Sequence, residues 1–247
     1  MSRTVVLVDA VRTPFGKAGG MYAGTRADDL MVRAIRGLLE RNPKVDPASI
    51  EDVAIAAATQ TGDQGMNIGR SAALLSGLPN TVPGYSIDRW CAGALTAVTT
   101  IAGAIAMGTN EIAIAGGVEH MGHVNMQHGF DHNPEASKFS AKASNMMGLT
   151  AEMLGKMHGI TRQQQDEFAA RSHRLAQKAT DEGKFKNEIV PMFGHDADGK
   201  EILVTQDETI RPETTADSLG KLRPAFDPKS GTVTAGTSSQ ITDGASA

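Results

Sequence analysis

The single cysteine of the chain, Cys91, is the side chain best suited to act as a nucleophile. It follows a strand-like segment and precedes a charge-free run of small and apolar residues from Ala92 to Met107. The start of a helix carries a partial positive charge and free N–H groups, which favour a thiolate. A nucleophile between a strand and a helix recurs in acyl transfer. The alternative reading is a small buried hydrophobe, since cysteine is often buried.

A group of histidines follows further along the chain, with acidic residues beside it: His120, His123, His128 and His132, with Glu119 and Asp131. Zinc sites use such residue types. The spacings of three, five and four residues match no common metal-binding motif. We therefore expect no metal site here, and read the segment as an irregular loop or as part of a substrate lining.

Two glycine pairs, Gly19-Gly20 and Gly116-Gly117, do not indicate a nucleotide site. They lack the Gly-Lys-Ser/Thr ending of a phosphate-binding loop, and no Gly-x-Gly-x-x-Gly follows a strand. Methionines gather in the middle of the chain, where they are either flexible packing or an adaptable lining for an acyl chain. These methionines are Met121, Met126, Met146, Met147, Met153 and Met157.

The composition is that of a soluble globular protein. The chain has 247 residues, 40% hydrophobic and 21% charged, with a net charge of -4. The absence of a long basic run argues against a nucleic-acid partner. One cysteine allows no disulfide within the sequence and fits a reducing compartment. We see no secretory leader and no apolar run approaching the roughly 20 residues that span a bilayer. A cytoplasmic location without a membrane span is therefore expected.

The first half alternates strand and helix patterns. We predict strands at Thr4–Val8, Val53–Ala57, Val82–Ile87 and Glu111–Ala115. Helices are predicted between Thr25 and Asn42, at Ile68–Leu75 and at Ala92–Met107. The last of these is apolar all round, which predicts burial on all sides. This alternation predicts an α/β fold with helices on both faces of a sheet.

The chain changes character after Val118. Residues 118–148 lack periodicity, and a polar helix is predicted at Thr161–Asp181, with Thr161 as its cap and Phe168, Leu175 and Ala179 as its apolar set. Strand character returns at Thr232–Ala235. The ending after Asp243-Gly244 reads as the first turn of a helix cut short, so we expect a fragment. The predicted domains are a core at 1–118, an insertion at 119–225 and a return to the core at 226–247.

Six segments, taken together and in this order, resemble the signatures of the thiolase family. They are Val8–Gly16, Ile87–Leu95 around Cys91, Ala115–Glu119, Met147–Glu152, Lys221–Phe226, and Gly231–Gly236 followed by Asp243-Gly244. The resemblance covers the whole chain. It implies a thiolase-like layered α/β fold with a mixed sheet between helices, of which this chain is one of two similar halves with a loop-domain insertion.

The resemblance also implies roles for particular residues. Cys91 falls where thiolases carry the acyl group as a thioester. Residues at coenzyme A-contacting positions are Arg211, Ser218, Phe226, Ala235, Ser239 and Met147. Coenzyme A is then a substrate, and no cofactor or metal is implied. Two positions depart from the family: Gly93 stands where Ser is usual and is expected to loosen the turn, and Met146 stands where short-chain biosynthetic members have His.

The activity implied is that of an acetyl-CoA C-acyltransferase of fatty-acid metabolism. It cleaves a 3-ketoacyl-CoA thiolytically, or runs the reverse Claisen condensation. Met146 favours a degradative, β-oxidation enzyme because it makes one wall of the site more apolar. The implied partners are coenzyme A thioesters, a second copy in a homodimer or homotetramer, and a β-oxidation α subunit.

The chain as given lacks the later Gly-His-Pro segment and the second cysteine that thiolases use, so we expect it to be inactive alone. Three alternatives stay open. One is a non-catalytic acyl-CoA- or lipid-binding relative, although binding alone needs no thiolate. Another is a ketoacyl synthase, which shares the fold but which the Lys221–Phe226 segment and the long insertion disfavour. The third is a structural half that works beside another polypeptide.

Overall fold

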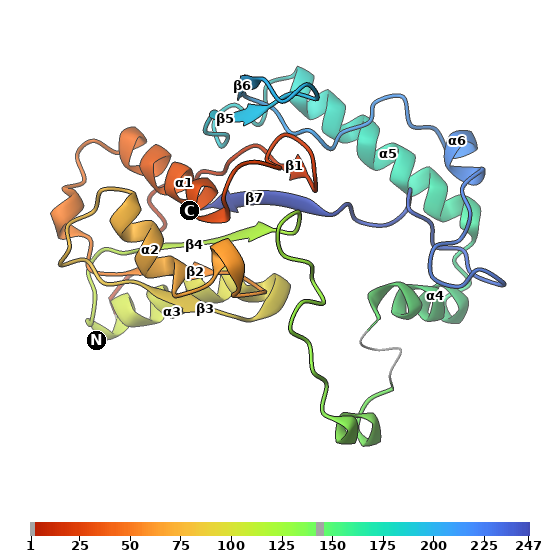
Figure 1. Cartoon of the computed structure of the whole chain (residues 1–247), viewed down its shortest axis with the longest axis horizontal. Coiled ribbons are helices and arrows are strands. Elements are labelled where there is room, and N and C mark those ends of the chain that lie inside the picture. Colours follow the sequence, from red (N-terminus) through yellow and green to blue (C-terminus); the bar gives the residue numbers. More distant parts are fainter. Residues whose placement is uncertain (1–2, 142–145) are drawn as a thin grey trace. The chain divides into compact units, whose positions relative to one another are not determined.

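The computed structural model describes residues 3–141 and 146–247, which form two compact units (Figure 1). Unit 1 comprises Met1–His128, Phe185–Thr209 and Ile241–Ala247, and unit 2 comprises Gly129–Lys184 and Ile210–Gln240. Both units are therefore built from separate stretches of sequence. The division at 118 and 225 follows sequence signatures instead of contacts, and it stays a prediction of domain organisation.

Unit 1 contains a mixed five-stranded sheet in the order β1-β7-β4-β2-β3. The strands are β1 (Gly16–Lys17), β2 (Val53–Ala56), β3 (Tyr85–Ile87), β4 (Ile114–His120) and β7 (Thr242–Ser246). Strand β2 runs parallel to β3 and β4, whereas β7 is antiparallel to β4 and β1. A hairpin of β5 (Met192–His195) and β6 (Glu201–Val204) forms a separate sheet. The expected mixed sheet between helices is confirmed.

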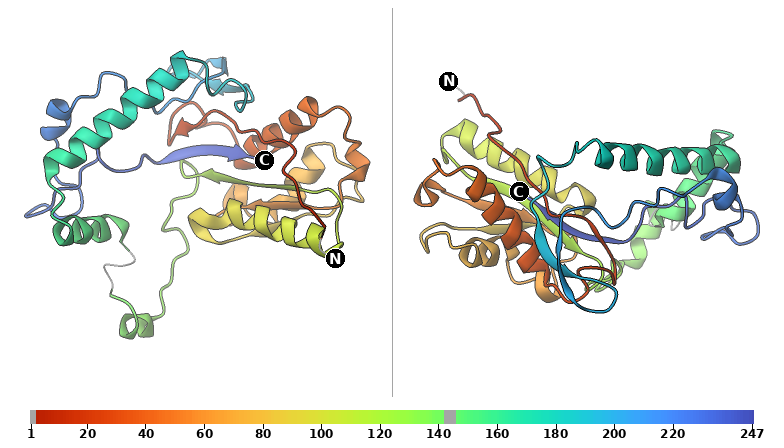
Figure 2. Two further views of the ribbon diagram at one scale, coloured as in Figure 1. Left: turned by 180° about the vertical axis from the view of Figure 1, so that it is seen from behind. Right: turned by 90° about the horizontal axis from the view of Figure 1, so that it is seen from above.

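Helices cover both faces of this sheet, as Figure 2 shows. Helices α1 (Ala27–Arg41) and α2 (Ile68–Leu75) pack on one face, and α3 (Gly93–Met107) packs on the other. The helical spacing of Leu30, Met31 and Ile35 places them on one side of α1, where they are fully buried against the sheet. The positions predicted for α1 and α2 are confirmed.

The predicted strand at Thr4–Val8 is wrong. The segment is not paired, and Val6, Leu7 and Val8 are 71%, 79% and 72% exposed. A strand needs a hydrogen-bonded neighbour, and the antiparallel pairing with the last residues reaches only Arg12 with Ser246 and Val11 with Ala247. Among the described residues, no strand lies beside the segment before Val11.

The helical turn predicted after Asp243-Gly244 is also wrong, because these residues form β7. Asp243 and Ala245 are buried and their neighbours less so, which is the period-two pattern of a strand. Pairing of β7 with β4 and β1 overrides the local helix preference of the alanines.

Helix α3 begins and ends near its predicted bounds, but it is not buried on all sides. Gly93, Ala97 and Ile101 are buried, whereas Leu95 and Met107 are 68% and 84% exposed. Its sequence extended to Trp90–Met107 is 18 residues with mean hydropathy 1.6, enough to cross a membrane by length and composition alone. One such stretch is weak support for a membrane span, because core helices have the same composition. Ala97 and Ile101 pack on Ala54 of β2, as a core helix does.

Unit 2 contains α4 (Met147–Met157), α5 (Arg162–Asp181) and α6 (Ala216–Gly220). The predicted cap of α5 is confirmed: Thr161 and Gln164 form a capping box. The predicted apolar set is wrong in part, because Phe168 and Leu175 are 69% and 47% exposed. The predicted strand Thr232–Ala235 is reduced to one antiparallel bridge between Pro224 and Thr234.

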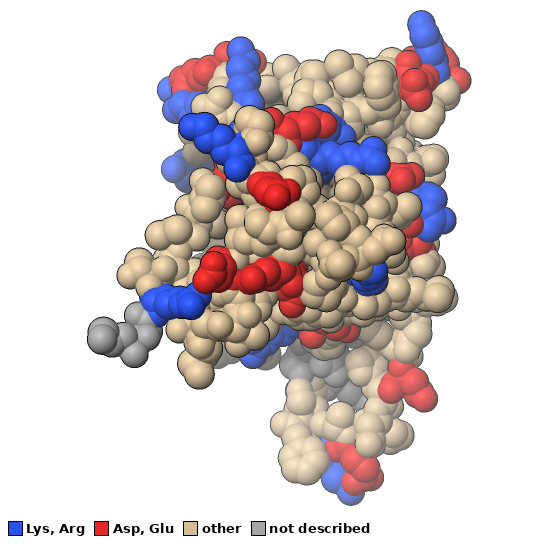
Figure 3. Space-filling view, turned by 90° about the vertical axis from the view of Figure 1, so that its left-hand side faces the viewer, with Lys and Arg blue, Asp and Glu red and all other residues tan. Residues whose placement is uncertain are grey.

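Short 3-10 turns connect the longer elements. They are η1 (Pro47–Ser49), η2 (Gly62–Gln64), η3 (Trp90–Ala92) and η4 (Pro134–Lys138). On the molecular face drawn in Figure 3, basic and acidic side chains are interspersed, and wide areas between them carry neither kind. This mixture of signs agrees with the small net charge of the sequence.

Candidate functional site

Cys91 lies on η3, between β3 and α3, and its side chain is exposed. The preceding residue, Trp90, has φ +48°, a left-handed conformation that is uncommon outside glycine. Asp88 accepts a hydrogen bond from the Trp90 N–H at 3.0 Å, which supports this turn. The turn follows the carboxyl end of β3, and the parallel strands β2 and β4 end at the same edge of the sheet. Cys91 is thus presented to solvent at the edge where α/β sheets bind ligands.

The start of α3 fits closely against the sheet. A Cβ atom on Gly93 would lie 2.8 Å from Cβ of Ala56 in β2, and one on Gly117 in β4 would lie 2.9 Å from Cβ of Ala94. Both distances are too short for a normal contact. Gly93, which departs from the family at this position, lets the helix that follows Cys91 approach β2 closely.

A buried polar network lies at the end of β4. His120 is fully buried and stacks on His123, with ring centroids 3.7 Å apart. His120 Nε2 faces the Tyr22 carbonyl at 3.1 Å, and His120 Nδ1 accepts from the His123 N–H at 3.1 Å. His120 Nδ1 also lies 3.4 Å from Oδ1 of the buried Asp243. These contacts of the buried His120 ring therefore fix the chain after β4.

His123 is held in a different way. Its Nδ1 lies 2.8 Å from Asp63 Oδ2 and its Nε2 lies 2.9 Å from the Ala23 carbonyl oxygen. The hydrogen bond to Ala23 and then that to Asp63 raise the pKa of His123. Burial opposes ionisation of Asp63, but hydrogen bonds from His123 and the Ala27 N–H lower its pKa overall. Because Ala27 begins α1, this pair links the start of α1 to the loop after β4.

Two of the four clustered histidines thus have structural contacts in unit 1. His128 and His132 lie in the exposed segment that follows, where the His132 ring packs edge-on against Phe130. Within residues 3–141 and 146–247, no three His, Cys, Asp or Glu side chains gather as metal ligands would.

The six residues at implied coenzyme A positions all belong to unit 2, whereas Cys91 belongs to unit 1. Two of the six, Met147 and Phe226, lie near the start of α4. The Phe226 ring covers Gly148 so closely that Gly148 has no room for a Cβ, and Met147 is the adjacent residue. Both side chains keep exposed surface, 67% for Met147 and 41% for Phe226.

Arg211 and Ser218 lie near α6 but have different surroundings. Ser218 belongs to a capping box with Thr215, and its hydroxyl donates to the Thr215 carbonyl at 2.8 Å. The exposed Arg211 side chain is in none of the ion pairs found among the described residues, and its backbone N–H donates to His173 Nδ1 at 3.2 Å. Its charge is therefore open to an anion from solvent, while Ser218 already has a partner.

Ala235 and Ser239 lie on an irregular segment whose side chains at these positions are exposed. The segment turns at the fully buried Thr234, whose backbone N–H donates to Thr237 Oγ1 at 2.9 Å. The Thr234 carbonyl accepts from the Ser238 hydroxyl at 2.7 Å. These bonds give the segment a defined conformation without a sheet.

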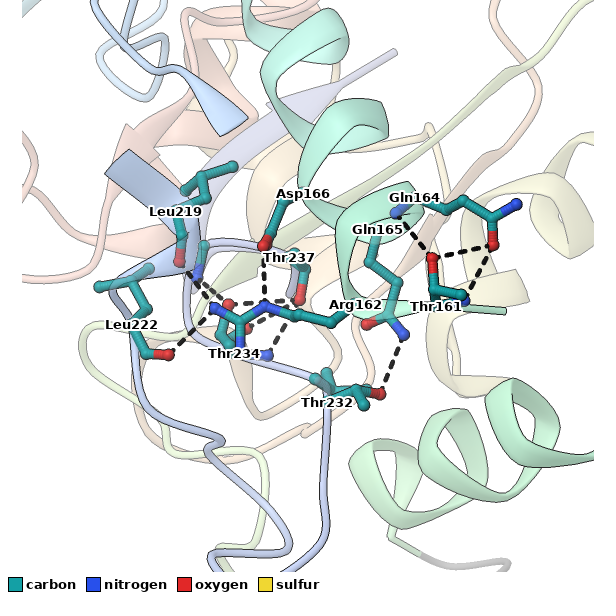
Figure 4. Close-up of polar contacts among 12 residues, drawn as sticks. Thr161, Arg162, Gln164, Gln165, Asp166, Leu219, Leu222, Thr232, Thr234 and Thr237 are labelled. Carbon is teal, nitrogen blue, oxygen red and sulfur yellow. Dashed lines mark hydrogen bonds and ion pairs between the residues drawn. The ribbon is translucent and has the colours of Figure 1, made fainter. Parts of the chain in front are cut away.

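Sequence reasoning missed the charged residues that hold these segments. Figure 4 shows Arg162 of α5 reaching the carbonyls of Leu219 and Leu222, at 2.7 and 3.0 Å. Glu152 of α4, which is 4% exposed, accepts hydrogen bonds from the backbone of Thr232 and Val233. A sign was available for Glu152, since it is the one charged residue in the otherwise uncharged stretch Met147–Leu154.

Comparisons with known proteins agree with this picture. The family described as "Thiolase, N-terminal domain" matches residues 5–247. The chain is 61% identical to a 3-ketoacyl-CoA thiolase of Marinobacter nauticus, 59% to one of Hahella chejuensis and 57% to one of Stutzerimonas stutzeri. Each alignment covers 99% of this chain and 63% of the relative.

A solved structure shows the same fold. It is the acetyl-CoA acetyltransferase of Bacillus anthracis, with a TM-score of 0.82 and 36% identity, and the match covers 96% of this chain and 62% of that one. The chain thus spans a little under two thirds of the proteins to which it is similar.

Proposed function

This chain belongs to the thiolase family, whose amino-terminal domain it matches, and we propose that the protein is an acetyl-CoA C-acyltransferase with Cys91 as its nucleophile. The observation that carries the proposal is the turn at Cys91. The thiol is exposed, follows a left-handed Trp90, and precedes a helix packed closely on the sheet. This arrangement suits a thiol that must meet a substrate at a fixed place.

The reaction follows from the chemistry of a thiolate. Cys91 Sγ attacks the ketone carbon of a 3-ketoacyl-CoA and forms a carbon–sulfur bond. The bond between the α and β carbons then breaks, and acetyl-CoA leaves after its carbanion takes up a proton. The thiol of a second coenzyme A attacks the Cys91 thioester, loses its proton and carries the acyl group away. Two easier steps replace one difficult carbon–carbon cleavage.

The proposed coenzyme A site uses the exposed residues of unit 2. Arg211 suits a phosphate of the nucleotide, because a guanidinium forms charge-assisted hydrogen bonds with phosphate oxygens. Met147 and Phe226 form an apolar surface, and Ala235 and Ser239 offer small side chains to the uncharged pantetheine arm. Ser218 completes the set from α6.

Further proposals concern the oligomeric state, the cellular location and the metabolic direction of the reaction. We place the protein in the cytoplasm, in the degradative direction of fatty-acid β-oxidation, as a homodimer or homotetramer that associates with an α subunit. Coenzyme A is a substrate, and no further cofactor is proposed. The names of the relatives, 3-ketoacyl-CoA thiolase, support the degradative direction. Light scattering of the full-length protein at micromolar concentration is expected to give a dimer or larger; an active monomer contradicts the assembly.

The test of the function is to trap the intermediate. Full-length protein mixed with a 3-ketoacyl-CoA in the absence of free coenzyme A should gain the mass of the acyl group on the peptide that contains Cys91. Cys91→Ser should lose thiolysis and the adduct, while keeping its affinity for acyl-CoA. An acyl-CoA-binding protein without catalysis would bind the substrate and show no adduct, and that result would reject the proposal.

A further inference from the structure

We propose that Glu152 is a positioning residue for coenzyme A, acting through the backbone of Thr232 and Val233. The inference rests on the proposed function, in which Ala235 and Ser239 contact the pantetheine arm of coenzyme A. Glu152 itself is buried and touches no ligand position; its effect reaches the site through the segment that carries these two residues.

The carboxylate of Glu152 accepts four hydrogen bonds from two consecutive residues. The Thr232 N–H lies 2.9 Å from Oε1 and 2.8 Å from Oε2, and the Val233 N–H lies 2.8 Å from Oε1. The Thr232 hydroxyl adds a contact of 3.2 Å to Oε2. Gly231 is part of this fit, because a Cβ there would lie 2.5 Å from Oε1.

A buried carboxylate is costly unless hydrogen bonds replace its hydration. Glu152 is in none of the ion pairs found among the described residues, so the N–H groups of Thr232 and Val233 replace the lost hydration of its carboxylate. The segment in turn lacks a strand ladder and has one bridge, between Pro224 and Thr234. Glu152 therefore accepts the backbone hydrogen bonds that a neighbouring strand would accept in a sheet.

The fixed backbone leads directly to the ligand positions. The Val233 carbonyl accepts a hydrogen bond from the Ala225 N–H at 2.9 Å. This bond fixes Ala225, the residue directly before Phe226. The next residue, Thr234, is the centre of the turn that leads to Ala235 and Ser239. One buried carboxylate thus sets the backbone that carries three of the six proposed contacts.

Two side chains of α5 contact, respectively, the same segment and the stretch Leu219–Leu222, as Figure 4 shows. Gln165 donates to Thr232 Oγ1 at 2.9 Å. Arg162, paired with the buried Asp166 at 2.8 Å, holds the carbonyls of Leu219 and Leu222. Gly236 packs on the side chains of these two leucines with no room for a Cβ. The turn therefore packs on residues that α5 holds, and removal of the Glu152 carboxylate takes the acceptor from the Thr232 and Val233 N–H groups.

The experiment compares wild type, Glu152→Gln and the control Glu167→Gln in the full-length protein. Glu167 lies exposed on α5, so its substitution removes the same charge away from the segment. Glutamine at 152 puts an NH₂ group against the N–H groups of Thr232 and Val233. We expect KM to rise about tenfold, ~1.4 kcal/mol of binding free energy, with kcat within about twofold and Glu167→Gln unchanged.

Substrate truncation separates positioning from general damage. Glu152→Gln should raise KM for 3-ketoacyl-pantetheine as well as for 3-ketoacyl-CoA, since the segment faces the pantetheine arm. Arg211→Ala should raise KM for the coenzyme A substrate alone, because the truncated substrate lacks the nucleotide. If Glu152→Gln does not fold, Thr232→Val removes the hydroxyl contacts with Glu152 and Gln165 and keeps the backbone N–H groups, and we expect KM to rise about threefold.

The outcomes separate this inference from the function on which it rests. A folded Glu152→Gln with unchanged KM, or with reduced kcat and unchanged KM, overturns the inference while wild-type thiolysis stands. If only Thr232→Val folds, an unchanged KM in that variant overturns it equally. Wild-type protein without thiolysis overturns the proposed function and this inference together.

Discussion

At the scale of single residues, Arg211 is open to an anionic ligand, because its side chain is exposed and has no ion pair among the described residues. Arg211→Ala should raise KM for coenzyme A substrates about tenfold at low ionic strength, since an arginine–phosphate contact contributes ~1 to 3 kcal/mol. The turnover number should change much less, because the contact is similar in the ground and transition states. Steady-state kinetics over a range of salt measures both effects.

The salt series also supplies the control for Arg211. Screening should shrink the difference between wild type and Arg211→Ala as salt rises. Arg171→Ala, which removes another exposed arginine from unit 2, should leave KM unaltered. Equal KM values for Arg211→Ala and wild type at low salt would mean that Arg211 is an ordinary solvated charge.

The pair of His123 and Asp63 predicts how stability depends on pH. The pKa of His123 is raised, so its contribution is fully present below the unfolded value of about 6.5 and is lost as pH rises through the folded value. The pKa of Asp63 is lowered, so its contribution is present above the unfolded value of about 3.9 and is lost as pH falls through the folded value. The pair therefore stabilises unit 1 most in the mildly acidic range.

Melting temperatures of the full-length protein against pH test this pair. His123→Gln should melt below wild type near pH 5 to 6, and the gap should narrow as pH rises above neutrality. His128→Gln serves as the control, because His128 lies in the exposed segment beyond the pair. A gap that widens toward high pH would contradict the assigned cause of the shift.

The spacing of interacting residues along the chain decides which contacts can be predicted from sequence. The turn at Cys91 was predictable, because the residues that build it are adjacent: Asp88, Trp90 and Gly93 lie within one short stretch. Glu152 and Thr232 are 80 positions apart, and His123 and Asp63 are 60 apart. No local pattern indicates such pairs, so the sequence alone predicted that Cys91 lies between a strand and a helix and missed the residues that hold the loops.

At the scale of elements, the start of α3 depends on close contact with β2. Gly93→Ala places a Cβ 2.8 Å from Cβ of Ala56, and overpacking of this kind costs about 1 to 3 kcal/mol. Ala56→Gly removes the opposing methyl group, so the double variant should recover part of the loss. Urea unfolding of the four proteins in a double-mutant cycle measures the coupling.

Helix α3 also offers a matched control, a Gly→Ala substitution that should raise the stability of the protein instead of lowering it. A Cβ on Gly103 would meet nothing within 4 Å, and Gly103 is exposed. Gly103→Ala should therefore stabilise the protein by roughly 0.5 to 1 kcal/mol through helix propensity. If Gly93→Ala stabilises to the same extent, the close approach of α3 and β2 has no energetic importance.

Helices were easier to predict from sequence than strands, for a physical reason. The bounds of α2 and α5 follow from local signals: apolar spacing, and the capping box of Thr161 and Gln164. Strand formation depends on partners distant in sequence. Thus Thr4–Val8 has strand-forming residues but no neighbour among the described residues, whereas Thr242–Ser246 looks helical and is paired on both sides.

At the scale of the whole molecule, the arrangement in two units explains why the predicted domains were drawn differently. Residues 185–209 belong to unit 1 although they lie inside the predicted insertion. They are held there by contacts that are remote in sequence: Arg12 pairs with Asp207 at 2.7 Å, and with Glu188 at 2.7 Å. Charge content made this stretch look like surface loop, whereas its charges bind it to the loop around β1.

The exposed face of α3 leads to a prediction about the 247-residue chain expressed by itself. Leu95 and Val98 lie one turn apart and are 68% and 39% exposed, and Val6, Leu7 and Val8 are more exposed still. Stable monomers rarely leave large areas of apolar surface open. Since the relatives are longer than this chain, we expect the chain alone to bind the dye ANS, to self-associate and to show no thiolysis.

The double variant Leu95→Gln with Val98→Gln isolates the contribution of this helix face in the 247-residue chain. Both side chains are exposed, unlike Ala97 and Ile101, which pack α3 on the sheet, so the substitutions should leave far-UV circular dichroism unchanged. ANS fluorescence should fall severalfold and light scattering should shift toward the monomer, because charge-free polar groups replace the apolar contact surface. Undiminished ANS binding in a folded double variant would place the open apolar surface elsewhere, with Val6–Val8 as the next segment to substitute.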